Sequence, residues 1–196
     1  AAFGLRGFFG ADRPAPPGAP THEALWERTI RIYRTAVPVA ERFGIKIAMH
    51  GNDPPVPSLS GVPQILYDFA AFDRLFKEVP SANCGMTFCV GTRYESGEDV
   101  LEGINKFGGQ GRIFHVHFRN VQGRIPEIKE YQEVIPDTGD LNMARVARAL
   151  HKVGYEGVID HDHIMKLTTD GPAGREYIAY CVGHMRGILQ SMEDNG

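Results

Sequence analysis

Cysteine is scarce in this chain of 196 residues: there are three, an odd number at irregular spacing, which excludes a disulfide framework. No apolar run approaches the roughly 20 residues that would span a bilayer. The first residues, Ala1-Ala2-Phe3-Gly4, lack the basic segment and the apolar stretch of a secretory signal. From these absences we expect a soluble, cytoplasmic protein.

An excess of positive charge is also missing. Lysine and arginine number 21 against 24 acidic residues, which gives a formal charge of −3. Proteins that bind nucleic acid or an anionic membrane carry basic surfaces, so we expect neither partner. Hydrophobic residues make up 42% of the chain, which is ordinary for a globular protein. We expect a single domain over residues 1–196 with a small molecule as its partner.

The order of patterns along the chain alternates between strands and helices. Glycine and proline fill residues 1–20, which we expect to form a loop or linker. Helical spacing predicts helices at 22–43, after the N-cap Thr21, and at 70–78, 98–107 and 174–192, with another that Asp140 caps and Gly154 ends. Short apolar runs predict strands at 45–50, 84–89, 112–117 and 157–162, and residues 120–139 read as a long polar excursion.

Such alternation predicts βαβ units and a parallel sheet, either a barrel or a doubly wound sheet. A residue able to bind a transition metal stands at the carboxyl end of each predicted strand: His50, Cys89, His117 and Asp162. Parallel α/β folds assemble their sites from strand ends, and imidazole, thiolate and carboxylate groups all bind divalent ions. The four placements together therefore favour a metal site.

Each residue also has an ordinary structural reading. Taken alone, Cys89 is more often a small buried hydrophobe, and each histidine is more often a polar group with its hydrogen bonds satisfied. His115 faces the same side as His117 but lies deeper in its strand, where a hydrogen-bonded core role is expected. Arg119 is either a clamp for a carboxylate or half of a surface ion pair. Asp53 either binds substrate or caps a turn.

Several motifs in order resemble those of the D-mannonate dehydratases, a family with a xylose-isomerase-like (β/α)8 TIM barrel. The segment 38–41 is similar to the Pro-Val-Ala-Glu of that family. The family's His-Pro-Asp-Asp-Pro-Pro is similar to residues 50–55, with Gly51 and Asn52 as replacements. Its Phe-Cys-x-Gly looks like residues 88–91, its His-x-His-x-Arg-Asn like residues 115–120, and its Asp-His pair after a Gly-Tyr-x-Gly-x-Ile strand like residues 162–163.

The resemblance implies roles residue by residue. It implies that the four strand-end residues hold one ion, usually Mn²⁺, with Fe²⁺ or another divalent ion as alternatives. His163 would be the catalytic histidine and Tyr177 the catalytic tyrosine, with Tyr180 as an alternative. Sugar-acid binding would fall to Asp53, Arg119 and Asn120. The doubled Asp160-His161-Asp162-His163 also permits Asp160 and His161 as the ligand and catalytic pair, because a slip of two residues keeps the same face.

Length is the main departure from the family. A (β/α)8 barrel typically needs about 250 residues, and this chain resembles the C-terminal half of one. We expect the other strands either to precede Ala1 in the natural protein or to come from a partner, and we favour the first. Because an open sheet edge promotes association, we also expect a homo-oligomer.

The resemblance implies a lyase of hexuronate catabolism, which dehydrates D-mannonate to 2-keto-3-deoxy-D-gluconate. A cation would offset the charge that develops when the proton next to the carboxylate is lost. Two alternatives remain: a sugar isomerase or epimerase of the same superfamily, and a non-catalytic module that binds a sugar acid.

Overall fold

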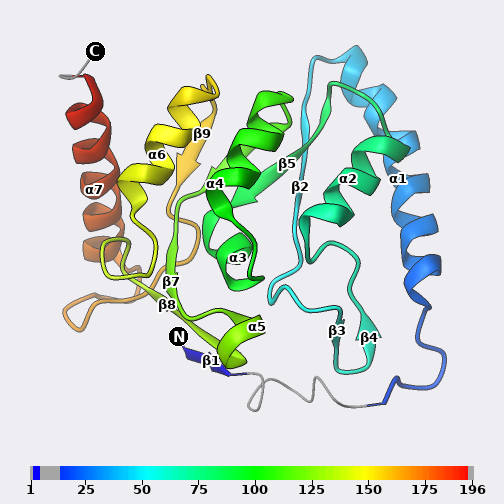
Figure 1. The fold of residues 1–196 in the computed structure, drawn as a ribbon, viewed down its shortest axis with the longest axis horizontal. Helices are drawn as coiled ribbons and strands as arrows, with labels where there is room; N and C mark the ends of the chain where they lie inside the picture. The colour runs from blue at the N-terminus through cyan, green and yellow to red at the C-terminus, as the bar shows by residue number, and fades with distance from the viewer. Residues whose placement is uncertain (1, 5–13, 194–196) are drawn as a thin grey trace.

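A parallel sheet forms the centre of the molecule. The computed structural model describes residues 2–4 and 14–193, and Figure 1 shows their arrangement. The central strands lie in the order β2 (Ile47–His50), β5 (Cys84–Cys89), β6 (Ile113–His117) and β9 (Val158–Asp160), and every neighbouring pair is parallel. The four strands predicted from the sequence are therefore present, with ends that differ by at most two residues. Their carboxyl ends all lie at the same edge of the sheet.

The long helices begin where their capping residues allow. Thr21 caps α1 (His22–Arg42) and Asp68 caps α2 (Phe69–Glu78), each by accepting a backbone N–H. The cap of α6 (Met143–Lys152) is Asn142, so the prediction that Asp140 caps this helix was wrong. The Asp140 carboxylate instead accepts from the Gly123 N–H at 2.8 Å. The last helix, α7, covers Arg175–Glu193.

The region between β5 and β6 holds more structure than predicted. A short helix, α3 (Val90–Glu95), follows Cys89 directly and was not predicted. The expected helix at 98–107 is divided into α4 (Val100–Gly103), capped by Asp99, and a π-helical turn, η1 (Ile104–Gly108). The turn carries Phe107 into the core, where it is fully buried.

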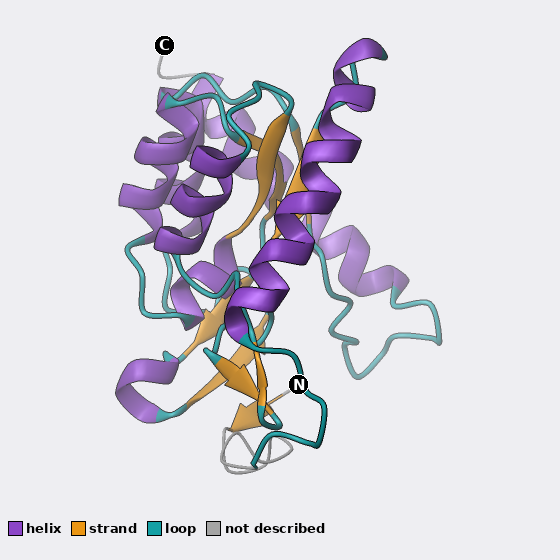
Figure 2. Ribbon diagram, turned by 90° about the vertical axis from the view of Figure 1, so that its right-hand side faces the viewer, coloured by secondary structure: helices purple, strands orange, loops and turns teal. Residues whose placement is uncertain are grey.

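A second, smaller sheet corrects two further predictions. The polar excursion 120–139 contains β7 (Asn120–Gln122), α5 (Ile125–Ile128) and β8 (Glu130–Val134). Strand β1 (Ala2–Gly4), in the segment predicted to be a loop, pairs antiparallel with β8, and β7 pairs with its other side. A hairpin of β3 (Ser58–Leu59) and β4 (Val62–Pro63) follows β2. Figures 1 and 2 show the sheet of β1, β8 and β7 beyond the carboxyl ends of the central strands.

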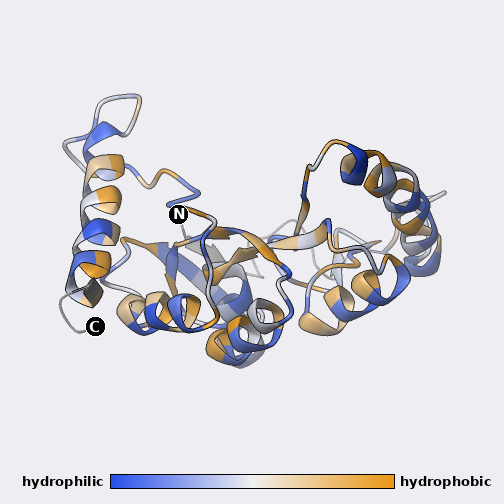
Figure 3. Cartoon of the chain, turned by 90° about the horizontal axis from the view of Figure 1, so that it is seen from above, coloured by the Kyte–Doolittle hydropathy of each residue, from blue (hydrophilic) through white to orange (hydrophobic). Residues whose placement is uncertain are grey.

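The hydrophobic core lies between the central sheet and the helices on its outer side. Viewed from above, the helices form an arc along the sheet (Figure 3). Large buried side chains from the strands and helices meet there, and burying each stabilises the fold by roughly 1.5–3 kcal/mol. They include Phe72, Leu75, Met86, Phe88, Ile104, Phe107, Val116 and Leu150. This core fixes the strands whose ends carry the polar residues.

Strands β2 and β9 are the edges of the central sheet in the described part of the chain. Val158 of β9 is 63% exposed, and an edge of this kind can pair with another strand. The association of several copies remains a prediction. None of the helices in the described ranges is long and apolar enough to cross a membrane.

Candidate functional site

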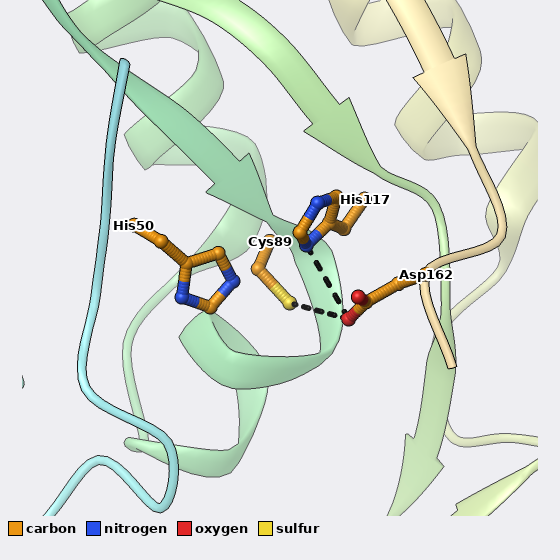
Figure 4. A group of neighbouring side chains, drawn as sticks. All are labelled: His50, Cys89, His117 and Asp162. Atoms are coloured by element: carbon orange, nitrogen blue, oxygen red, sulfur yellow. Dashed lines mark hydrogen bonds and ion pairs between the residues drawn. The ribbon is translucent and has the colours of Figure 1, made fainter.

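Four candidate metal ligands converge at the carboxyl ends of the central strands (Figure 4). One potential ligand atom from each of His50, Cys89, His117 and Asp162 lies within 4.8 Å of all the others. Three of them end β2, β5 and β6, and Asp162 follows β9 by two residues. The structure thus brings together the quartet that the strand ends predicted.

The two histidine rings present nitrogen atoms to this cluster. Nδ1 of His50 lies 2.6 Å from the carbonyl oxygen of Gly51, so a proton on Nδ1 leaves Nε2 free to act as a ligand. The ring centroids of His50 and His117 are 4.9 Å apart. Nδ1 of His117 is buried and makes no hydrogen bond, although it lies 3.3 Å from Oδ2 of Asp162. A buried nitrogen without a hydrogen bond is what a metal ligand looks like without its ion.

Charge around Cys89 favours the thiolate. Burial raises the pKa of this thiol, but the Arg119 guanidinium and the rings of His117 and His50 outweigh burial and bring the pKa well below its usual range. The Thr92 hydroxyl donates to Sγ at 3.0 Å, and Oδ2 of Asp162 lies 3.9 Å from the same sulfur. A thiolate is the form of cysteine that binds metal.

The same proximity shifts the partners of Cys89. Burial lowers the pKa of His117, while the Asp162 carboxylate and the Cys89 thiolate raise it to about 10. Burial raises the pKa of Asp162, and contact with His117 and the charges of His163 and Arg119 bring it to about 2. A divalent cation could take the place of the proton on His117, and the set of imidazole, thiolate and carboxylate donors suits one.

Two carboxylates, Asp160 and Asp162, lie at the end of β9, and they have different partners. Asp160 pairs with His115, whose Nε2 lies 2.8 Å from Asp160 Oδ2. Its Oδ1 accepts from the backbone N–H of Asp162 at 2.9 Å, and Asp162 has a left-handed φ of 61°. This turn directs the Asp162 carboxylate to His117. Asp160 still lies beside His117 in the strand register, so the alternative in which Asp160 replaces Asp162 as the ligand is compatible with the structure.

Arg119 lies at the centre of the site but does not present a free guanidinium. It is 3% exposed, and all three of its guanidinium nitrogens contact side chains of the protein. Its partners are Asp53 at 2.7 Å, Glu95 at 2.5 Å, Thr92 at 2.7 Å, Glu133 at 3.0 Å and Asp162 at 3.2 Å. This geometry favours a residue that organises carboxylates over the expected clamp on a sugar acid.

The other two predicted substrate residues differ from each other. Asn120 is fully buried, and its side-chain amide donates to the carbonyls of Pro136 and Leu141 at 2.7 and 2.9 Å. Its oxygen accepts from two backbone N–H groups, so it fastens a loop and has no polar atom left for a ligand. Asp53 is partly exposed beside Arg119, and one oxygen accepts from the Tyr131 hydroxyl at 3.0 Å. Only Asp53 of this trio therefore keeps access to solvent.

The two predicted catalytic residues occupy different surroundings. His163 is about half exposed, and its Nε2 lies 3.6 Å from Oδ2 of Asp162. Tyr177 is buried, and its ring meets that of His161 edge-on at 6.0 Å. Tyr180 is 37% exposed and stacks on His184. The structure brings His163 to the ligand cluster and places Tyr177, rather than Tyr180, in the protein interior.

Sequence reasoning missed several residues around Arg119, chiefly Glu95, Tyr131 and Glu133. Burial raises the pKa of Glu95 to about 8 although Arg119 opposes the shift. Glu133 is 6% exposed and its Oε1 accepts from Nδ1 of His163. Buried Tyr131 and Glu133 alternate with exposed neighbours in β8, but the letters of this segment do not show which residues are buried, so the sequence offered no clear signal for them.

Comparison with known proteins agrees with the site and the fold. A family model for D-mannonate dehydratase (UxuA) matches residues 20–195. Mannonate dehydratase 2 of Halalkalibacterium halodurans is 35% identical over 144 residues, which are 73% of this chain and 41% of that protein. The chain thus spans about two fifths of the length of this curated relative.

Two solved structures show the same fold. The crystal structure of mannonate dehydratase from Streptococcus suis serotype 2 superposes with a TM-score of 0.81 at 24% identity, over 98% of this chain and 58% of that one. A xylose isomerase domain protein from Planctomyces limnophilus gives 0.64 at 16% identity, over 86% and 55%. The chain therefore forms part of a xylose-isomerase-like TIM barrel, and it belongs to the D-mannonate dehydratase family.

Proposed function

We propose that this protein is a metal-dependent lyase that dehydrates D-mannonate to 2-keto-3-deoxy-D-gluconate in hexuronate catabolism. The observation that carries the proposal is the convergence of His50, Cys89, His117 and a carboxylate at the strand ends of a chain in this family. Two further observations support a cation at this point: the buried Nδ1 of His117 makes no hydrogen bond, and the surroundings of Cys89 lower the pKa of its thiol well below the usual range, which favours the thiolate that binds metal.

In this proposal His50, Cys89, His117 and Asp162 hold the ion, with Asp160 as the alternative carboxylate. Mn²⁺ is the ion we propose, and Fe²⁺ or another divalent ion suits the same mixture of nitrogen, sulfur and oxygen donors. When bound, the cation supplies positive charge that stabilises the negative charge developing on the sugar acid.

The remaining chemistry belongs to the side chains. His163 is the proposed base: its Nε2 faces the cluster and takes the proton from C2 of D-mannonate. Tyr177 is the proposed acid. Burial and the neighbouring Cys181 raise its pKa above the ordinary value, which keeps the phenol protonated so that it can give a proton to the departing C3 hydroxyl. That hydroxyl leaves as water, and the enol product then converts to the keto acid.

Asp53 is the proposed contact for the sugar hydroxyls, because it combines a fixed position with access to solvent. We propose that Arg119 and Asn120 support the site from behind. Arg119 orients Asp53 and Asp162, and Asn120 holds the 136–141 loop beside them.

The test is turnover with a product assay. Purified protein loaded with Mn²⁺ should convert D-mannonate to a product lighter by one water, detected by mass spectrometry. A product of unchanged mass would identify an isomerase or epimerase instead. Bound Mn²⁺ with no turnover of the natural full-length protein would identify a non-catalytic module that binds sugar acids. Either result would refute the proposed dehydration.

A further inference from the structure

One buried acid next to the site has no part in the roles described so far. Glu133 lies on β8, a strand of the small sheet, and is 6% exposed. Buried carboxylates are rare unless they are paired, so its partners indicate its purpose. Oε1 accepts from Nδ1 of His163 and lies 3.0 Å from Nη1 of Arg119.

The strand ladder holds Glu133 in place. It pairs with Val121 of β7, and β1 pairs along the opposite side of β8. Tyr131, two residues earlier and also buried, donates its hydroxyl to Asp53. The inner face of β8 thus delivers two polar groups to the site. Arg119 contacts the same carboxylate oxygen, Oε1, that accepts from His163, and so helps to hold it in place.

Contact with Glu133 selects the form of the His163 ring. A carboxylate that accepts from Nδ1 requires the proton on that nitrogen, so the neutral ring carries its lone pair on Nε2. Nε2 is the atom that lies 3.6 Å from Asp162 Oδ2 and faces the ligand cluster. Because the side chain is 51% exposed, contacts with the protein, rather than close packing all round, must hold the ring in this orientation.

We propose that Glu133 is a positioning residue that fixes the orientation and tautomer of His163, so that Nε2 serves as the base. This inference rests on the proposed function. In the step, Nε2 takes the C2 proton and the electron pair of the C–H bond stays on the substrate. Glu133 keeps its hydrogen bond to Nδ1 and its negative charge stabilises the resulting imidazolium. The C3–O bond then breaks, and the hydroxyl leaves as water with a proton from the acid group.

A competing role for Glu133 is simply to neutralise Arg119. Glu95 offers the matched control, because its Oε1 contacts the same nitrogen of Arg119 at 2.5 Å and none of its hydrogen bonds or ion pairs in the described structure involves His163. Glu95→Gln is isosteric and resembles the protonated form that burial favours. It changes the carboxyl group that contacts Arg119 while leaving the contact between Glu133 and His163 intact.

The experiment combines nitrogen NMR with kinetics on the Mn²⁺-free and Mn²⁺-loaded protein. Histidine labelled with ¹⁵N reports which ring nitrogen carries the proton, and His163→Gln assigns the signal. We expect Nδ1–H in the unaltered protein and in Glu95→Gln, and a mixed or reversed tautomer in Glu133→Leu. In the loaded protein, Glu133→Leu should lower kcat by about 100-fold or more, with a smaller change in KM.

Glu133→Gln is the conservative variant and covers the case in which Glu133→Leu does not fold. Its amide oxygen can still accept from Nδ1, so we expect the native tautomer and a kcat between those of the unaltered protein and Glu133→Leu. An unchanged tautomer in Glu133→Leu, or equal losses of kcat in Glu95→Gln and Glu133→Gln, would overturn the inference. A tautomer change in a protein that never dehydrates D-mannonate would instead refute the proposed function and retain the positioning role.

Discussion

Replacing Arg119 by Met should destabilise the protein strongly, because the guanidinium is the shared counter-ion of four carboxylates. Two of these, Glu95 and Glu133, have side chains that are 0% and 6% exposed. Removing one partner of a buried ion pair typically costs about 3–5 kcal/mol. The partly exposed Asp53 and Asp162 add less, since water can solvate them. We therefore expect a loss of about 3–5 kcal/mol in the free energy of unfolding.

Urea denaturation followed by circular dichroism measures this loss. The control is Arg34→Met, because Arg34 pairs with Glu78 at 2.7 Å but both side chains are well exposed, at 60% and 39%. Exposed pairs contribute about 0–1 kcal/mol. A loss of less than about 1 kcal/mol for Arg119→Met, or equal losses in the two variants, would refute the idea that Arg119 holds the carboxylates together.

The loss of stability in Arg119→Met should also depend on pH, and it should be larger at higher pH. Burial raises the pKa of Glu95 from 4.5 to about 8 even with Arg119 present. When the pKa of a carboxyl group is higher in the folded state than in the unfolded state, its contribution to stability is full at a pH below the unfolded-state pKa. That contribution is lost as the pH rises through the folded-state pKa. Arg119→Met should therefore be more damaging at pH 8 than at pH 6, where Glu95 carries its proton. A loss that is the same at both values would contradict this reading.

Three further predictions concern the ion. His117→Ala should abolish tight Mn²⁺ binding in calorimetry. His115→Ala should weaken binding by about 10–100-fold, as is usual when a residue that supports a ligand is removed. Equal losses in the two variants would contradict the assignment of His117 as the ligand and His115 as its support. Asp162→Asn should weaken binding more than Asp160→Asn, and the reverse order would assign the ligand to Asp160. The pKa of His117 is raised to about 10, so Mn²⁺ binding should release a proton from this ring, which an indicator dye can detect. For the same reason Mn²⁺ affinity should rise from pH 6 to pH 9. An affinity that does not depend on pH would contradict this prediction.

The sequence carried enough to predict the central sheet and the ligand cluster. Each strand is a short apolar run, and polar residues interrupt the apolar pattern where the strand ends, so His50, Cys89 and His117 could be located by counting. Parallel strands bring their carboxyl ends to one edge, and this geometry gathers residues that lie far apart in the chain. The helix caps were equally local, which is why Thr21 was found.

Other features depended on contacts that a single sequence does not display. Strand β8 reads as polar because its exposed residues are polar. Its inner Tyr131 and Glu133 are stabilised by Asp53, Arg119 and His163 rather than by an apolar core. Asp140 was mistaken for a helix cap because Asn142, two residues later, is just as good a capping residue.

Arg119 shows a similar limit. Its position after β6 suggested a clamp for a sugar acid, but the number of its partners depends on carboxylates from several separate elements. Asp53 follows β2, Glu95 lies in α3, Glu133 in β8 and Asp162 after β9. No periodicity along one segment reveals such a meeting, and only the folded arrangement shows that its donors are already occupied.

The most direct test of the metal site is the absorption spectrum of the protein loaded with Co²⁺ in place of Mn²⁺. A thiolate ligand gives an intense charge-transfer band in the near ultraviolet, which nitrogen and oxygen ligands do not produce. We predict this band for the unaltered protein and for His115→Ala, and its loss in Cys89→Ser. A Co²⁺ complex without the band, or a band that persists in Cys89→Ser, would contradict the assignment of Cys89 and the strand-end cluster as the metal site.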